Sequence, residues 1–183
     1  MNEIIVIGGG IAGVSAAARL SNFATVTVLE QEEHLAYHAS GRSAASFIID
    51  YGNETTRVLN ECSFIHLKEH ANGVLSDRGL MVLSKKSEEL EFEKAYKALG
   101  LSKISLNDAY MRIPIINKTT VSYAAYREDV YDLDTNKLIE NFVKEARQNS
   151  CKFVQNARVE KINFKNFKWT INTQKHEYSS SVL

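Results

Sequence analysis

Three glycines near the N-terminus, Gly8, Gly10 and Gly13, have the G-x-G-x-x-G spacing of a loop that binds a pyrophosphate. In such a loop the first glycine makes a tight turn, the second lets the backbone approach the phosphates, and the third lets a helix pack close to a strand. The helix N-terminus adds free N–H groups and a partial positive charge. Glu30 ends the next predicted strand, where its carboxylate can accept hydrogen bonds from ribose hydroxyls. Because a carboxylate repels a phosphate on that ribose, the pattern predicts an adenine dinucleotide without one.

The elements expected around these residues form a β-α-β unit. Residues 4–7 are a short apolar run typical of a strand buried in a parallel sheet, and residues 25–29 predict a second strand. Between them, the alanine-rich residues 11–20 favour a helix. The glycine loop therefore lies where its mechanism requires, between a strand and a helix.

The rest of the chain predicts an inserted region of different character. Helices are expected at 54–70, 87–100 and 134–147, and strands at 78–83, within 113–126, and at 151–155, 157–164 and 168–173. Val58, Cys62 and Ile65 share one stripe of the first of these helices, which indicates a surface helix. The predicted fold is α/β: a Rossmann-like domain with a parallel sheet, formed by residues 1–75 and 134–183, with an incomplete α+β substrate domain inserted at 76–133.

The order of elements bears on the choice between NAD and FAD. An NAD-binding domain normally continues directly into another short helix and a third strand, whereas here a strand-like run returns only near Cys151. Early interruption by another domain favours FAD, by analogy between folds. A fragment of an NAD-dependent dehydrogenase stays open as an alternative.

Composition excludes several other classes of function. Lys and Arg number 22 and Asp and Glu also 22, so no overall charge favours nucleic acid or an anionic membrane, and no segment resembles a transmembrane helix. Cys62 and Cys151 are far apart, which favours free thiols and a cytoplasmic location. His66 and His70 match an H-x-x-E-H pattern but have no recognisable third ligand, so no metal site is expected.

The segment AYHASGRSAAS at 36–46, taken with GGGIAG, Glu30 and DYGN, resembles the FAD-dependent amine and D-amino acid oxidoreductases of the D-amino acid oxidase and glycine oxidase superfamily. Its nearest likeness there is to the D-arginine dehydrogenases and their relatives. RGLMVL, RIPII and YDLDTNKL extend the likeness over essentially the whole chain. The resemblance implies FAD as cofactor and oxidation of a C–N bond by hydride transfer to the flavin, with a small-molecule amine or D-amino acid as substrate and the electron acceptor left open.

The resemblance also implies roles for particular residues. The pyrophosphate loop would comprise Gly8, Gly10, Ala12 and Gly13, and the ribose contacts Glu30 and Gln31. The flavin half of the cofactor would be wrapped by His38, Ala39, Ser40, Gly41, Arg42, Ser43, Ala44, Ala45 and Ser46. The backbone of Val159 would meet the adenine, and Tyr51 would lie over the substrate.

Two departures from the family pattern shape these expectations. Leu80 stands where the arginine-selective relatives have an acidic residue, which favours a less cationic substrate. The chain is also shorter than the family's enzymes, so it is interpreted as a truncated N-terminal part with little or no turnover by itself. The alternative from another class is a truncated, non-catalytic paralogue that binds nucleotide.

Overall fold

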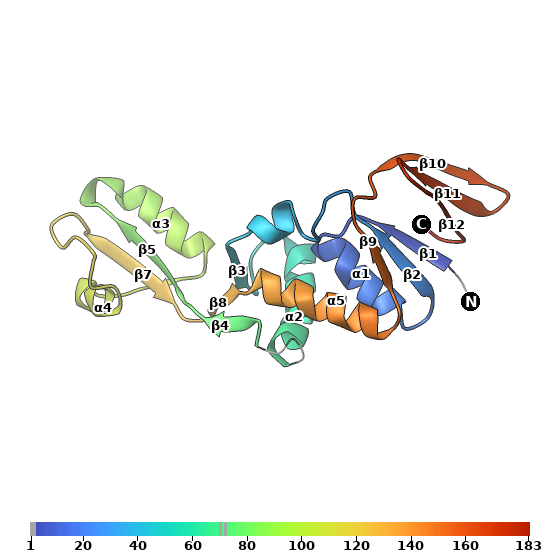
Figure 1. Cartoon of the computed structure of the whole chain (residues 1–183). Helices are drawn as coiled ribbons and strands as arrows, with labels where there is room; N and C mark the ends of the chain where they lie inside the picture. Colours follow the sequence, from blue (N-terminus) through green and yellow to red (C-terminus); the bar gives the residue numbers. More distant parts are fainter. Residues whose placement is uncertain (1–2, 70, 72) are drawn as a thin grey trace. The chain divides into compact units, whose positions relative to one another are not determined.

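The computed structural model describes residues 3–69, 71 and 73–183, which form two compact units (Figure 1). The terminal unit contains the residues up to Ala44 together with Asp134–Leu183, and the inserted unit is Ala45–Leu133. The units divide at 44/45 and 133/134, whereas the sequence analysis drew its first division at 75/76. The reason is strand pairing, since Ala45–Ile48 forms antiparallel pairs with Val130–Leu133 inside the inserted unit.

The terminal unit has three layers. Its elements are β1 (Glu3–Ile7), α1 (Ile11–Leu20), β2 (Thr25–Leu29), the 3₁₀ turn η1 (Ala39–Arg42), α5 (Thr135–Gln148), β9 (Lys152–Val154), β10 (Val159–Lys165), β11 (Lys168–Thr173) and β12 (Glu177–Ser180). Strands β1, β2 and β9 form a parallel sheet in the order β1-β2-β9, and β10, β11 and β12 form an antiparallel one. Helices α1 and α5 lie side by side (Figure 1).

Small apolar residues hold these layers together. Ala17 and Ala18 of α1 pack with Val28 of β2 and Ala146 of α5, all with no exposed surface. On the other side, the side chain of Ile171 in β11 is fully buried in a second cluster with residues of β1 and β2. The parallel sheet is therefore covered by helices on one face and by the antiparallel sheet on the other, as its continuous apolar strands require.

The inserted unit is built on two antiparallel sheets. Its elements are β3 (Ala45–Ile48), α2 (Glu54–Glu69), β4 (Leu75–Asp77), β5 (Leu80–Ser84), the 3₁₀ turn η2 (Lys86–Glu88), α3 (Glu89–Ala98), β6 (Ser102–Lys103), α4 (Leu106–Arg112), β7 (Tyr123–Arg127) and β8 (Val130–Leu133). The strand orders are β3-β8-β4 and β5-β7-β6. Phe92 of α3 is buried against Leu101 and Ala125, which fixes α3 on the second sheet.

Most predicted elements are confirmed, several within one or two residues. Helix α1 and strands β2 and β11 have the predicted bounds, and α5 begins where expected because the Asp134 carboxylate accepts from the N–H of Lys137. The strands expected within 113–126 are largely wrong, since only β7, from Tyr123, is a strand. Before it, the Asn117 side chain accepts two hydrogen bonds from Thr119 and holds a turn instead.

Helix α2 is present as predicted, but its apolar stripe does not pack inward among the described residues. Val58 and Ile65 are 53% and 58% exposed, and Cys62 is exposed as well. The helix instead buries Leu67 and stacks Phe64 on Phe47 of β3, with ring centroids 6.0 Å apart. The face of α2 that packs on β3 therefore differs from the stripe that the sequence pattern indicated.

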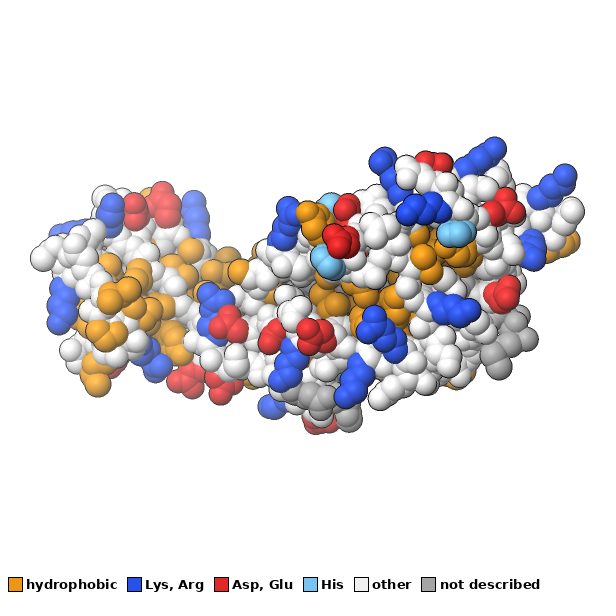
Figure 2. Space-filling model, viewed as in Figure 1, with side chains coloured by type: hydrophobic (Ala, Val, Ile, Leu, Met, Phe, Trp, Pro, Cys, Tyr) orange, Lys and Arg blue, Asp and Glu red, His pale blue; other side chains and the backbone are white. Residues whose placement is uncertain are grey.

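Across the described residues, none of the helices has the length and apolarity needed to cross a bilayer. On the face that Figure 2 displays, basic and acidic side chains are interspersed, in keeping with the balanced composition.

Candidate functional site

The glycine loop joins β1 to α1, and its backbone excludes larger residues at two positions. Gly8 has φ +102°, a conformation that L side chains rarely adopt, and its N–H donates to the carbonyl of Leu29 at 2.8 Å. A Cβ at Gly13 would lie 1.9 Å from the carbonyl oxygen of Gly8, so the helix approaches the strand closely only because Gly13 has no side chain. The roles expected for these two glycines, a tight turn and close helix packing, match this geometry.

The N-terminus of α1 borders a pocket through Gly10. Gly10 is the N-cap of the helix and contributes no side-chain cap. The N–H of Ile11 donates to the Ser40 hydroxyl at 3.0 Å, which ties η1 to the start of the helix. Helix N-termini bind phosphate through such N–H groups and through the helix dipole. This donor set fits a pyrophosphate.

Glu30 is buried at the end of β2, with 7% of its surface exposed. One carboxylate oxygen accepts from the N–H of Gly9 at 2.6 Å, and the other from the N–H of Glu32 at 2.9 Å. Each oxygen can accept a further hydrogen bond. The carboxylate is therefore oriented by the backbone and keeps acceptor capacity for the two hydroxyls of a ribose.

A pocket of about 320 Å³ brings the glycine loop and Glu30 together. Its lining comprises Ile7, Gly8, Gly10, Leu29, Glu30, Gln31, His38, Ala157 and Val159. The pocket lies at the carboxyl ends of β1 and β2, which is where open α/β sheets bind ligands. Six of its residues were predicted from the sequence; the other three, Ile7, Leu29 and Ala157, add apolar walls. Ile7 and Leu29 were predictable as pocket residues because they end the two apolar strands beside the glycine loop. No sequence pattern indicated that Ala157 would line the pocket.

The polar rim of this pocket, called here the nucleotide pocket, includes His38. Its Nε2 atom lies 2.9 Å from a carboxylate oxygen of Glu32 and 3.4 Å from Nε2 of Gln31. The three side chains thus form one hydrogen-bonded cluster, and two of them, Gln31 and His38, line the pocket. With apolar walls for a planar base, a carboxylate for ribose and glycines for phosphates, the pocket fits the adenosine diphosphate half of FAD.

The remaining predicted cofactor residues lie outside the lining of this pocket. Ala12 is in the first turn of α1; Ala39, Ser40, Gly41 and Arg42 form η1; Ser43 and Ala44 follow it; Ala45 and Ser46 begin β3. A Cβ at Gly41 would lie 2.3 Å from the carbonyl oxygen of Ala36, so η1 needs glycine there. Ser46 accepts from Nη1 of Arg78 at 2.8 Å, within the inserted unit. Whether these residues contact the flavin stays a prediction.

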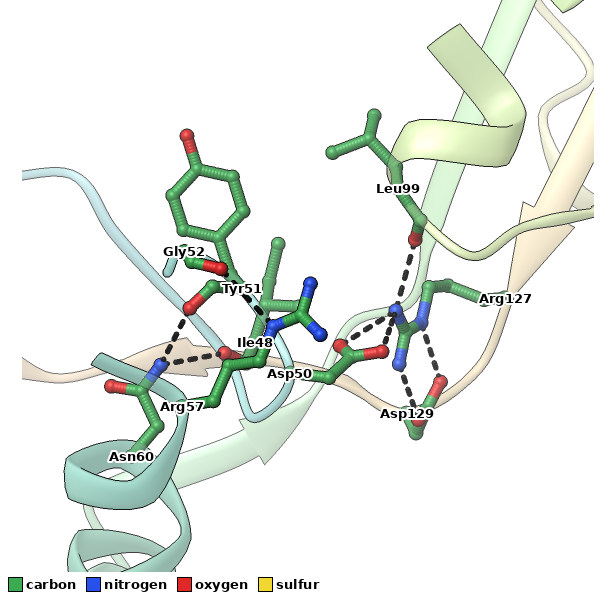
Figure 3. Close-up of polar contacts among 9 residues, drawn as sticks. All are labelled: Ile48, Asp50, Tyr51, Gly52, Arg57, Asn60, Leu99, Arg127 and Asp129. Atoms are coloured by element: carbon green, nitrogen blue, oxygen red, sulfur yellow. Dashed lines mark hydrogen bonds and ion pairs between the residues drawn. The ribbon is translucent and has the colours of Figure 1, made fainter. Parts of the chain in front are cut away.

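Tyr51 lies in a turn of the inserted unit, and side chains of α2 donate hydrogen bonds to the backbone of this turn (Figure 3). The Asn60 amide donates to the carbonyls of Ile48 and Tyr51 at 3.3 and 3.1 Å, and Nε of Arg57 donates to that of Gly52 at 3.0 Å. The Tyr51 side chain itself is exposed, with 61% of the residue's surface accessible. The structure therefore fixes the backbone of this turn and leaves the phenol free to contact a ligand.

Arg127 holds the other side of the same turn (Figure 3). Its side chain is only 10% exposed; it donates to both carboxylate oxygens of Asp129, to Asp50 at 2.9 and 3.2 Å, and to the carbonyl of Leu99 at 2.9 Å. Hydrogen bonding to Asp129 is the largest of the effects that raise the pKa of Arg127, and the same contact lowers the pKa of Asp129. Sequence reasoning missed this arginine because Asp50 and Arg127 are far apart in the chain.

No cluster of three or more potential metal ligands occurs among residues 3–69, 71 and 73–183, and His70 of the H-x-x-E-H pattern lies outside them. A larger groove, of about 720 Å³, runs between Leu35–Ala36 and α5 and contains none of the predicted cofactor residues.

Comparison with known proteins gives one family for nearly the whole chain. The family described as "DAO: FAD dependent oxidoreductase" matches residues 3–182. This match agrees with the family expected from the glycine loop and the 36–46 segment, and it favours FAD over NAD.

Solved structures with the same fold support this result. L-proline dehydrogenase from P. horikoshii matches with a TM-score of 0.77 and 21% identity over 99% of this chain and 51% of its own. L-alpha-glycerophosphate oxidase from Mycoplasma pneumoniae, solved with FAD bound, matches with a TM-score of 0.81 and 17% identity over 99% and 51%. Glycine oxidase from Bacillus cereus ATCC 14579 matches with a TM-score of 0.84 and 16% identity over 100% of this chain and 56% of its own. The chain thus spans about half the length of these proteins.

Proposed function

Because the chain belongs to the DAO family of FAD-dependent oxidoreductases, we propose that it binds FAD through its terminal unit and serves oxidation of an amino acid or related amine. The observation that carries the proposal is the nucleotide pocket, in which Gly8, Gly10 and the buried Glu30 line one cavity. These residues lie far enough apart in sequence that only the fold brings them to one place.

In this proposal each part of the pocket holds one part of the cofactor. The N–H groups at the start of α1 bind the pyrophosphate, and Glu30 with Gln31 binds the ribose. The apolar residues Leu29 and Val159 contact the adenine. The 38–46 segment, with its small residues and Arg42, wraps the flavin half, as the family resemblance implies.

The finer proposal is a D-amino acid or a related amine as substrate, oxidised at its C–N bond. Bound FAD supplies a two-electron acceptor for the hydride that leaves the substrate Cα. The substrate amine reacts in its neutral form, and its nitrogen loses a proton, so the organic product is an imine that water hydrolyses to an oxo compound and ammonia. Positioning and exclusion of water are the protein's contributions to such a reaction.

Tyr51 is proposed to contact the substrate. Two features support this role: the family resemblance at DYGN, and a backbone held by Asn60, Arg57 and Arg127 while the phenol remains exposed. A fixed backbone with a free side chain is suited to presenting a group to a ligand.

Titration of FAD with the purified chain tests the cofactor proposal. Flavin fluorescence should be quenched saturably, and the complex should keep a visible flavin absorbance band after gel filtration. Glu30→Gln replaces an acceptor with a donor-bearing amide and should weaken FAD binding by about tenfold or more, since hydrogen bonds to a charged group contribute about 1.5–3 kcal/mol. Glu33→Gln is the matched control, because Glu33 is exposed and does not line the pocket.

The same samples distinguish the alternatives. A chain that ignores FAD but binds NAD saturably would contradict the proposal in favour of a dehydrogenase. Equal affinity of Glu30→Gln and the unaltered chain for FAD would refute the role of Glu30.

A further inference from the structure

A second pocket, of about 490 Å³, lies within the inserted unit and is lined by two arginines and a tyrosine ring. Its lining comprises Arg78, Gly79, Leu80, Met81, Arg112, Ile113 and Tyr126. Both charged residues in this lining are cations. The pocket, called here the arginine pocket, shares no residue with the nucleotide pocket or with the Tyr51 turn.

Arg112, the last residue of α4, presents a stacked guanidinium. Its Cζ atom lies 4.1 Å from the centroid of the Tyr126 ring, and the nearest ion-pair contact is with Glu128 at 3.5 Å. That glutamate side chain is 80% exposed, so it remains solvated beside the arginine. Within the described residues the Arg112 guanidinium makes no hydrogen bond, and its planar set of donors is available to a ligand.

Arg78, between β4 and β5, is anchored at one nitrogen. Nη1 donates to Asp132 at 2.7 Å and to the Ser46 hydroxyl at 2.8 Å, and the backbone N–H donates to the carbonyl of Val130. Nε and Nη2 have no acceptor in the part of the chain that the structure describes. The Arg78 guanidinium is therefore held in place through Nη1, and its Nε and Nη2 atoms remain able to donate to a ligand.

The wall between the arginines is rigid and largely apolar. A Cβ at Gly79 would lie 2.2 Å from the Tyr126 hydroxyl oxygen, so the ring packs directly on the glycine backbone, which has φ +73°. Leu80, Met81 and Ile113 supply the apolar surface. Around α4 and β7, hydrophobic side chains also gather on the face that Figure 2 displays.

We propose that the arginine pocket binds the side-chain carboxylate of an acidic amino acid, which names the substrate class of the proposed oxidoreductase and rests on that function. Asp132 occupies only Nη1 of Arg78, and the ion pair of Arg112 with Glu128 is long, at 3.5 Å. The donors that these contacts leave open can give a substrate carboxylate charge-assisted hydrogen bonds. The apolar wall contacts the substrate's methylene groups. A cationic substrate would face two like charges, consistent with the expectation drawn from Leu80.

The test is a titration of the 183-residue chain at low ionic strength, followed by calorimetry or NMR, with glutarate and its neutral isostere glutaramide. Glutarate should bind, glutaramide should not, and added salt should weaken binding. Arg112→Gln should reduce glutarate affinity by about tenfold or more, because it removes a charged donor group. Lys94→Gln, which removes one charge from an exposed position in the same unit, should leave the affinity unchanged.

A second variant keeps the proposal testable if Arg112→Gln fails to fold. Glu128→Gln removes the acidic neighbour of Arg112 and should tighten glutarate binding. Equal binding of glutarate and glutaramide, or no response to either substitution, would overturn the proposal. Equal binding of D-glutamate and D-glutamine would assign the pocket to the α-carboxylate and would overturn the side-chain assignment.

The outcome separates this proposal from the function on which it rests. A chain that binds FAD but not glutarate refutes the arginine pocket and leaves the cofactor proposal standing. A chain that binds glutarate but not FAD supports the pocket as a carboxylate site and refutes its place in an FAD-dependent enzyme.

Discussion

Replacing Arg127 by methionine should destabilise the inserted unit and loosen the Tyr51 turn. The substitution keeps most of the aliphatic volume but removes the hydrogen bonds to Asp129, Asp50 and the Leu99 carbonyl. It also leaves two carboxylates near each other without the cation that neutralises them.

The size of the stability loss follows from how exposed the side chains that contact Arg127 are. Hydrogen bonds to a charged group contribute about 1.5–3 kcal/mol each. Asp50 and Asp129 have side chains that are 55% and 58% exposed, so water replaces much of what they lose. The expected loss is therefore about 2–3 kcal/mol in total, or a fall in melting temperature of roughly 5–10 °C for a chain of this size.

Differential scanning calorimetry measures the stability, and hydrogen exchange at residues 49–53 reports the turn. Arg78→Met is the matched control: Arg78 also pairs with an aspartate in the inserted unit, but its side chain is 46% exposed, and the loss should be about 1 kcal/mol or less. If both variants lost the same stability, or if exchange in the turn were unchanged in Arg127→Met, the reasoning would be refuted.

The same pair predicts a dependence on pH. Because hydrogen bonding to Arg127 lowers the pKa of Asp129, this aspartate contributes stability above its ordinary pKa. That contribution is lost as the pH falls through the lowered value in the folded protein. The gap in stability between the unaltered chain and Arg127→Met should thus narrow in acid, and a gap that widens there would contradict the pairing.

Three further predictions test other parts of the fold. Asp134→Ala removes the N-cap of α5 and should lower stability by about 1 kcal/mol, measured by denaturant unfolding; no change would exclude a capping role. An aromatic disulfide reagent should modify the exposed Cys62 quickly and Cys151 slowly, since burial raises the pKa of the Cys151 thiol; a fast reaction that persists in Cys62→Ser would be inconsistent with this. Gly13→Ala should abolish FAD binding and lower the melting temperature, because the new Cβ would clash with the Gly8 carbonyl, and normal FAD binding by this variant would show that the loop can relax.

Local sequence determined the β-α-β unit and its loop. The bounds of α1 and β2 agreed with the prediction because alanine-rich and β-branched runs select helix and strand over a few residues. The tight turn at Gly8 and the close helix packing at Gly13 were predictable for a similar reason, since backbone conformation and close approach constrain these positions whatever surrounds them.

Short-range signals also explain two of the errors. The sequence analysis did not predict helix α4, although a local pattern indicates its start: the Ser105 hydroxyl accepts from the N–H of Asp108 and caps the helix. On α2, Val58, Cys62 and Ile65 suggested the packed stripe, whereas Phe64 stacks on Phe47 of the sheet and Leu67 is the buried residue.

Tertiary structure alone decided which distant residues share a site. Ala157 lines the nucleotide pocket with Glu30, Arg78 and Arg112 line the arginine pocket together, and Arg127 of β7 pairs with Asp50 of the Tyr51 turn. Periodicity reports which face of an element is apolar, but it holds no information on which element lies opposite. Sheet pairing and side-chain packing supply that information, so the glycine loop could be found from the sequence, while the residues that hold the Tyr51 turn and line the arginine pocket could not.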